Sequence, residues 1–217
     1  IARVGHPIRR EIEAPAKEGG YEFLKLDASV PSVFIMGGSQ GARAINNVVL
    51  DALPDLIQRY NIIHQAGAAN QLEVTNIASV VLKDIPNSHR YRTFGLLNVL
   101  ALKMAAGISS LALARAGSGT IFELASWGMP AVLVPIPEDV THDQTENAFS
   151  YARAGAAVVI EQRNLTSHLL VAEIDRIMAD SALREQMKAA ALAYARPQAA
   201  HKIAKLLLET SLEHEPV

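Results

Sequence analysis

Three short segments carry residues whose types and spacing could do chemistry. The first is GGSQGA, residues 37–42, which follows an apolar run and precedes a helix-like pattern. Glycines there let a ligand approach the backbone, and the start of the next helix offers unpaired N–H groups and the positive end of a dipole. The segment lacks the Gly-Lys-Ser/Thr of a P-loop, and its GGxxG spacing differs from GxGxxG. The pattern leaves phosphate binding and a purely steric strand–helix turn equally open.

The second segment is ARAGSGTIFELASWG, which also joins a strand-like run to a helix-like one. Gly117 and Gly119 again leave the backbone bare, and Arg115 places a cation near the turn, where it could meet a phosphate. Glu123 follows one turn into the helix, where a carboxylate could accept hydrogen bonds from a ribose diol. The same residue fits a capping box that begins at Thr120. The residues alone favour the cap.

The third segment is PIPEDVTHDQTENAF, residues 135–149, which follows another strand-like run. Gln144 and Asn147 lie near a predicted helix start, where their amides could bind sugar hydroxyls. The tetrad THDQ also fits a capping box. His142 and Asp143 could suggest a metal ligand or a general base, but a single histidine among scattered carboxylates is a weak signal. A solvated loop is the favoured interpretation of those two.

Alternating strand-like and helix-like runs must position these segments. The continuous apolar strands are typical of a parallel sheet covered on both faces, so we expect a doubly wound, Rossmann-like α/β domain. Ligands of such folds bind beyond the carboxyl ends of the strands. His64 is interpreted as a strand-end histidine with local partners. The predicted strands are 32–36, 61–67, 91–97, 108–114, 129–137 and 157–161, and the predicted helices are 42–60, 98–107 (ending at Gly107), 119–128 (closed by Gly128), 143–156 and most of the chain after about 166. Residues 70–85 are ambiguous.

Composition bounds the possible functions. The 217 residues carry a net charge of -2, so no overall basic field favours nucleic acid. Cysteine is absent, which excludes disulfides and thiolate chemistry. No apolar run is long enough to span a bilayer, and the N-terminus does not resemble a signal peptide. We expect a linker and domain start with one short strand over 1–31, a ligand-binding domain over 32–195 and a helical tail over 196–217.

Taken together and in order, GGSQGA, RAGSGTIFELASWGMPAVLVPIP, HDQTENA and ARAGAAVVI resemble the C-terminal half of the MurG family. The likeness runs from about Ser32 to Ile160. GHPIRREI near the start is similar to that family's interdomain segment, usually Gly-Asn-Pro-[Val/Ile]-Arg, with His6 in place of Asn. The family transfers N-acetylglucosamine (GlcNAc) from UDP-GlcNAc to lipid I in bacterial peptidoglycan synthesis. The resemblance implies one half of a GT-B glycosyltransferase, in which two Rossmann-like domains face a cleft.

The resemblance also implies which residues bind the nucleotide sugar. Glu123 would hold the ribose diol, which it can do while it caps its helix. Gln144 and Asn147 would contact the GlcNAc hydroxyls, and Phe94, with Gly95, is the nearest match to the segment that holds uracil. The implied diphosphate contacts are Arg9 and two loops, made of Gly38, Ser39, Gln40 and Gly41 and of Gly117, Ser118, Gly119 and Thr120.

The family's catalytic base and its lipid I surface belong to an N-terminal domain that this sequence does not resemble. We therefore expect an isolated donor domain that binds UDP-GlcNAc or UDP and transfers slowly or not at all, in an inverting reaction without metal or other cofactor. The lipid-linked acceptor would come through the N-terminal domain. The whole protein would be cytoplasmic and peripheral on the inner membrane, with no transmembrane segment and no nucleic-acid partner. Two alternatives stay open: another GT-B UDP-sugar enzyme, such as an epimerase or lipid glycosyltransferase, or a non-catalytic nucleotide-sugar-binding subunit.

Overall fold

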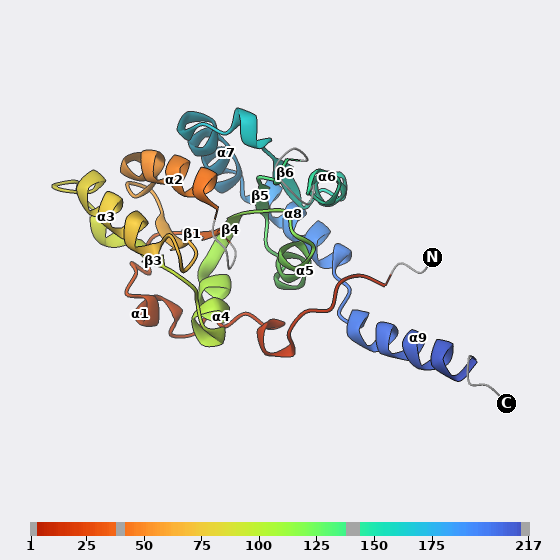
Figure 1. Cartoon of the computed structure of the whole chain (residues 1–217). Helices are drawn as coiled ribbons and strands as arrows, with labels where there is room; N and C mark the ends of the chain where they lie inside the picture. Colours follow the sequence, from red (N-terminus) through yellow and green to blue (C-terminus); the bar gives the residue numbers. More distant parts are fainter. Residues whose placement is uncertain (1–3, 38–41, 138–143, 214–217) are drawn as a thin grey trace.

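The computed structural model describes residues 4–37, 42–137 and 144–213. Its centre is a parallel six-stranded sheet in the order β3-β2-β1-β4-β5-β6 (Figure 1). The strands are β1 (Ser32–Met36), β2 (Asn61–Gln65), β3 (Tyr91–Phe94), β4 (Ser109–Ala114), β5 (Ala131–Leu133) and β6 (Ala157–Val159). The predicted doubly wound α/β fold is confirmed. The chain first builds outward from β1 to β3 and then returns to place β4 on the other side of β1, so the order of the strands reverses between β1 and β4.

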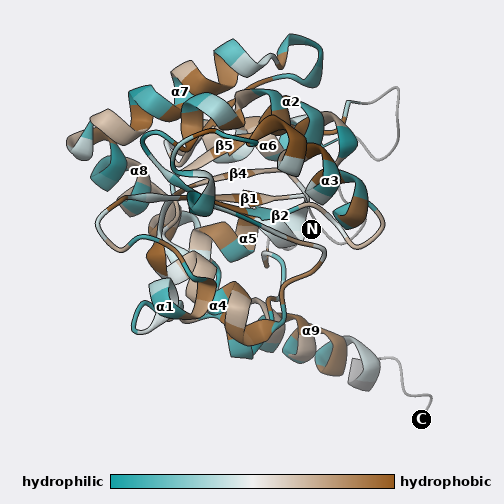
Figure 2. Ribbon diagram, turned by 90° about the vertical axis from the view of Figure 1, so that its left-hand side faces the viewer, coloured by the Kyte–Doolittle hydropathy of each residue, from teal (hydrophilic) through white to brown (hydrophobic). Residues whose placement is uncertain are grey.

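Helices cover both faces of this sheet. They are α1 (Gly20–Leu24), α2 (Arg43–Leu56), α3 (Gln71–Val81), α4 (Val99–Ile108), α5 (Ser118–Trp127), α6 (Thr145–Arg153), α7 (Ser167–Ala179), α8 (Ser181–Tyr194) and α9 (Ala199–Glu213), with short 3-10 turns η1 (Arg10–Ile12), η2 (Ser88–Arg90) and η3 (Gln162–Asn164). Figure 2 shows α2, α3 and α7 on one face and α1, α4 and α5 on the other. Each face has its own apolar core.

Strand β1 is buried along its whole length because both faces of the sheet are covered. All five residues of β1 are buried. Val33 and Ile35 join the core beneath α2 and α7, whereas Phe34 and Met36 join the core beneath α4 and α5. This alternation follows from successive side chains pointing to opposite faces of a strand. It explains why a strand buried on both sides reads as a continuous apolar run.

The N-terminal segment departs from its prediction. The short strand expected within residues 1–31 is wrong, because the segment forms η1 and the single-turn helix α1 instead. Gly19 turns the chain with a φ of 70°. One turn apart, Tyr21 and Leu24 then pack on the core beside α4. The ambiguous residues 70–85 contain helix α3, whose Val74 and Ala78 are buried four residues apart on one face.

Gly107 was expected to end a helix, and it lies inside α4, which continues to Ile108. A Cβ added at Gly107 would lie 2.3 Å from the carbonyl oxygen of Ala16. The glycine therefore permits the N-terminal segment to cross α4 at close range. Two hydrogen bonds hold that crossing, from the Ala16 N–H to the Lys103 carbonyl (2.9 Å) and from Trp127 Nε1 to the Ile12 carbonyl (2.6 Å). The crossing brings Arg9 to the carboxyl side of the sheet, where it lines the cavity described next.

Candidate functional site

A cavity of about 300 Å³ opens at the carboxyl ends of β1 and β2, beside the point where the strand order reverses. Parallel pairing sets Met36 opposite Gln65 and opposite Ala114, so these strands end level with one another. Such a reversal point is where ligands bind in open α/β sheets. The cavity is lined by Arg9, Met36, Gln65, Leu96, Leu97, Leu102, Gly119, Thr120 and Glu123. Four of these, Arg9, Gly119, Thr120 and Glu123, belong to the predicted site.

The start of helix α5 forms one wall of the cavity. The helix begins at Ser118, and Gly117 is its N-cap, with extended backbone angles and no side chain to cap the first turn. The N–H groups of that turn are therefore open to an acceptor, and the positive end of the helix dipole adds to them. The capping box predicted from Thr120 to Glu123 is wrong, because both residues lie inside the helix rather than at its boundary. Glu123 is thus free of a capping role.

Glu123 and Arg9 supply the charges of the cavity. The carboxylate of Glu123 forms no hydrogen bond or ion pair with the residues that the structure describes. Burial raises the pKa of this carboxyl above its ordinary value, and the charge of Arg9 offsets part of that rise. An unpaired, partly buried carboxylate can accept two hydrogen bonds from adjacent hydroxyls. Arg9 is exposed and can pair with an anion.

Gln144 joins two loops next to this site. Its Oε1 accepts hydrogen bonds from the N–H groups of Ala116 (3.0 Å) and Ile136 (3.3 Å). Its Nε2 lies 3.6 Å from where a Cβ on Gly117 would stand, so the amide covers the N-cap of α5. Asn147 lies one turn further along α6 and is exposed. Neither residue lines the cavity, although Gln144 borders the first turn of α5.

Arg115 is held by protein groups. Its guanidinium donates to the carbonyls of Val134 (3.1 Å) and Pro135 (3.3 Å) and to Oε1 of Gln162 (2.7 Å). These bonds fasten the end of β4 to the connection after β5 and to η3. The side chain does not line the cavity, so the structure does not bring Arg115 together with Arg9 and Glu123.

The wall formed by the β3–α4 connection was only partly anticipated. Phe94 ends β3, and its carbonyl accepts a hydrogen bond from the N–H of Ala66 (2.8 Å). The cavity is lined instead by Leu96 and Leu97, which the sequence pattern assigns to the end of a strand. The lining residues that sequence reasoning missed are Met36, Gln65, Leu96, Leu97 and Leu102. For two of them a positional signal was available, since Met36 ends the predicted strand 32–36 and Gln65 lies near the end of the predicted strand 61–67.

Several predicted residues lie outside the described residues, namely Gly38, Ser39, Gln40 and Gly41 of the first loop and His142 and Asp143 of the third. Gly37, which precedes the first of these gaps, donates its N–H to the carbonyl of Gln65 (2.9 Å). Gly37 is therefore bonded to a residue that lines the cavity. Among the described ranges, no group of three or more His, Asp or Glu side chains is placed to hold a metal ion. In the same ranges, no helix is both long and apolar enough to cross a membrane.

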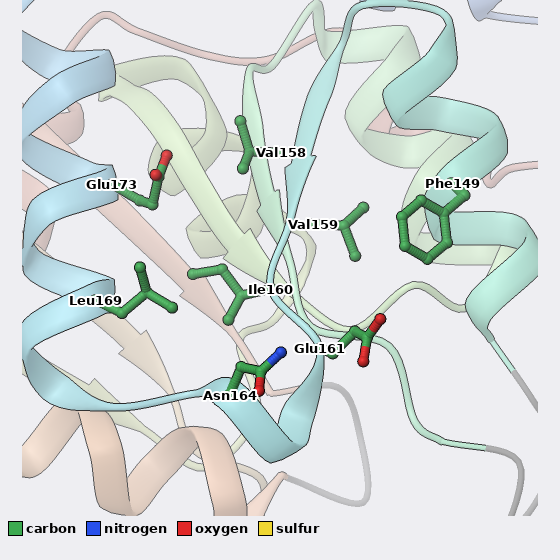
Figure 3. A pocket seen from close by; sticks show the side chains of 8 residues that line it. All are labelled: Phe149, Val158, Val159, Ile160, Glu161, Asn164, Leu169 and Glu173. Atoms are coloured by element: carbon green, nitrogen blue, oxygen red, sulfur yellow. The ribbon is translucent and has the colours of Figure 1, made fainter.

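A second cavity, of about 210 Å³, lies beside the edge strand β6 (Figure 3). It is lined by apolar side chains with two carboxylates, Glu161 and Glu173, that already have cationic partners. Glu161 pairs with Arg163 (2.6 Å) and Glu173 pairs with Arg176 (2.8 Å). Its lining residues include no cation, and the start of α7 beside it is capped by Thr166, whose hydroxyl accepts the N–H of Leu169 (3.2 Å). It is therefore a poor candidate for an anionic ligand.

Comparison with known proteins gives a consistent match. Residues 32–207 match the glycosyltransferase family 28 C-terminal domain. The chain is 35% identical over 217 residues to the UDP-N-acetylglucosamine–N-acetylmuramyl-(pentapeptide) pyrophosphoryl-undecaprenol N-acetylglucosamine transferase of Anaeromyxobacter sp. (strain Fw109-5), covering 96% of this chain and 52% of that protein. The transferase of the same description from Treponema pallidum (strain Nichols) is 31% identical over 205 residues, covering 94% and 53%. The chain spans about half the length of the curated relatives it matches.

Solved structures agree with this match. Acinetobacter baumannii MurG superposes with a TM-score of 0.73 at 27% identity, over 91% of this chain and 55% of that one. A putative UDP-N-acetylglucosamine 2-epimerase from Listeria monocytogenes superposes with a TM-score of 0.63 at 14% identity, over 96% of this chain and 50% of that one, which shows the shared fold alone. The resemblance drawn from the sequence motifs is confirmed, and the chain belongs to glycosyltransferase family 28.

Proposed function

We propose that these residues form the UDP-GlcNAc-binding domain of an inverting glycosyltransferase that transfers GlcNAc to a lipid-linked acceptor. The family match and the names of the relatives support this assignment. The observation that carries it is the cavity at the strand reversal. There an unpaired carboxylate, an exposed arginine and an uncapped helix start converge.

The diphosphate lies, in this proposal, against the first turn of α5 and beside Arg9. The N–H groups of that turn and the guanidinium are fixed donors for a group that gains negative charge as the sugar–phosphate bond breaks. These hydrogen-bonding groups speed the reaction only if they bind the departing diphosphate more tightly than they bind intact UDP-GlcNAc. The loop containing Ser39 would complete the diphosphate site.

The ribose and the base then have defined places. Glu123 lies a little over one turn beyond the diphosphate donors, where its carboxylate accepts the two ribose hydroxyls. The apolar part of the cavity, formed by Met36, Leu97 and Leu102, takes the flat base. On the opposite side of the diphosphate, Gln144 and Asn147 would bind the hydroxyls of the sugar.

The acceptor side of the reaction is also part of the proposal. Transfer requires groups that bind the lipid-linked acceptor and remove the proton from its attacking hydroxyl. We assign neither role to the described cavity residues and place both in a second domain, as the GT-B arrangement requires. A peripheral position on the cytoplasmic face of the inner membrane follows from the same assignment.

Calorimetric titration tests the donor site. We expect the unmodified chain to bind UDP and UDP-GlcNAc, and Glu123→Ala to bind UDP about 10- to 100-fold more weakly, because a hydrogen bond to a charged group contributes about 1.5–3 kcal/mol. The matched control is Glu173→Ala, which removes a helical carboxylate from the second cavity and leaves UDP affinity unchanged. A deoxyribose analogue, dUDP, adds a second arm. The unmodified chain should bind dUDP more weakly than UDP, and Glu123→Ala should bind the two with similar affinity.

Two outcomes would contradict the proposal. One is a folded, unmodified chain that binds neither UDP nor UDP-GlcNAc. The other is equal loss of affinity in Glu123→Ala and Glu173→Ala, because the carboxylate in the cavity would then have no special role.

A further inference from the structure

Gln65 hydrogen-bonds both to Gly37, which follows β1, and to the β3–α4 connection. It is the last residue of β2, and only 6% of its surface is exposed. Its backbone carbonyl accepts the N–H of Gly37, the residue that follows β1 (2.9 Å). Its side-chain Oε1 accepts the N–H of Leu97 in the β3–α4 connection (3.0 Å). One buried residue thus holds both the exit of β1 and the opposite wall.

Among the described residues, the other hydrogen bonds of this wall lie at its ends. The β3 end is tied by the bond from the Ala66 N–H to the Phe94 carbonyl (2.8 Å). The α4 end is tied by Asn98, whose side chain caps the helix by accepting the Ala101 N–H (2.9 Å). Between these ties, the Gln65–Leu97 bond is the hydrogen bond that the described residues provide. Leu97 is itself buried, so loss of this acceptor would leave a buried N–H unpaired.

The wall also gives the cavity apolar lining. Leu96, Leu97 and Leu102 line it from the β3–α4 connection and α4, whereas the charged residues Arg9 and Glu123 come from the N-terminal segment and α5. An anionic group therefore belongs with the charged residues, and a flat, weakly polar ring belongs against the leucines. The position of Leu97 then sets how wide a ring the cavity accepts.

We propose that Gln65 is a positioning residue that holds the β3–α4 connection in place and thereby sets the nucleobase preference of the site. This inference rests on the proposed nucleotide-binding function and extends it to base selection. Gln65 acts through Leu97 and needs no contact with the diphosphate. Its loss should accordingly weaken binding of the base and leave binding of the diphosphate intact.

The test compares ligands that share the diphosphate and differ in the base. Gln65→Met removes the acceptor at similar volume, and Gln65→Asn withdraws it by one methylene group, so that one variant remains if the other does not fold. Gln186→Leu, at an exposed position on α8, is the control. Affinities for UDP, ADP and inorganic pyrophosphate are measured by calorimetry on each folded variant.

We expect both Gln65 variants to bind UDP about tenfold more weakly and to show a smaller ratio of UDP to ADP affinity. Pyrophosphate affinity should stay within about twofold, and the control should match the unmodified chain. Parallel losses for UDP and pyrophosphate, or an unchanged UDP to ADP ratio, would overturn the inference and leave the proposed function standing. Absence of UDP binding by the unmodified chain would overturn both.

Discussion

Acidification should destabilise this domain through a single buried histidine. His64 lies in β2 and is completely buried. Its Nδ1 lies 2.9 Å from the hydroxyl of Tyr91, and its Nε2 lies 3.0 Å from Oδ1 of Asn46. Because the Asn46 amide nitrogen already donates to the Ala66 carbonyl, Oδ1 must accept from Nε2, and Nδ1 accepts from the tyrosine. The neutral ring is fully satisfied, and a second proton would place a positive charge in a site removed from water.

The magnitude follows from linkage between protonation and folding. Burial lowers the pKa of His64 from 6.5 to about 3. Below pH 6.5 His64 is protonated in the unfolded chain but stays neutral in the folded chain, so the free energy of unfolding falls as the pH falls. The full contribution is present above pH 6.5. About 2 kcal/mol should be lost between pH 7 and pH 5, and about 3 kcal/mol by pH 4.

Urea unfolding of the unmodified chain and of His64→Gln at pH 7 and pH 5 measures the contribution of His64 to the free energy of unfolding. The variant has no titrating group at the position, and the remaining histidines cancel in the comparison. The unmodified chain should lose about 2 kcal/mol more than the variant over this interval. Equal pH dependence in the two proteins would refute the assignment of a buried neutral ring.

Three further predictions test the packing and the site. Trp127→Phe should lower the free energy of unfolding by about 1–3 kcal/mol in urea titrations, because the carbonyl of Ile12 loses its buried donor. Gly107→Ala should cost a similar amount in the same assay, because the added methyl group meets the Ala16 carbonyl at 2.3 Å. UDP-GlcNAc affinity should fall on acidification at a higher pH than an exposed carboxyl would require, because burial raises the pKa of Glu123, and this fall should be absent in Glu123→Gln. Unchanged stability in the first two variants, or the same acid loss in the third, would contradict the corresponding contact.

Local patterns in the sequence account for most of the fold. The predicted strand 32–36 has the same bounds as β1. Gly128 ends α5 with a φ of 60°, as a helix-terminating glycine does. These features depend on neighbours in the chain or on the repeat of two residues in a strand and 3.6 residues in a helix, which a sequence displays directly. The local partners expected for His64 are wrong, because its two partners lie 18 and 27 positions away and join β2 to α2 and β3.

Contacts between distant segments account for what was missed. The capping box at Thr120 failed because α5 begins two residues earlier, at a backbone turn whose position depends on Gln144 from the next loop. The role of Gln65 was invisible because its bond to Leu97 joins residues 32 positions apart. Arg115 has the residue type of an anion ligand, yet its three hydrogen bonds go to groups beyond β5. No local pattern carries such information.

A crystal structure of this chain bound to UDP would show whether the cavity between Arg9 and Glu123 holds the nucleotide. We expect the diphosphate at the first turn of α5 beside Arg9, the ribose hydroxyls on the carboxylate of Glu123, and the base against Leu97. Nucleotide bound beside β6, or ribose hydroxyls turned away from Glu123, would contradict it.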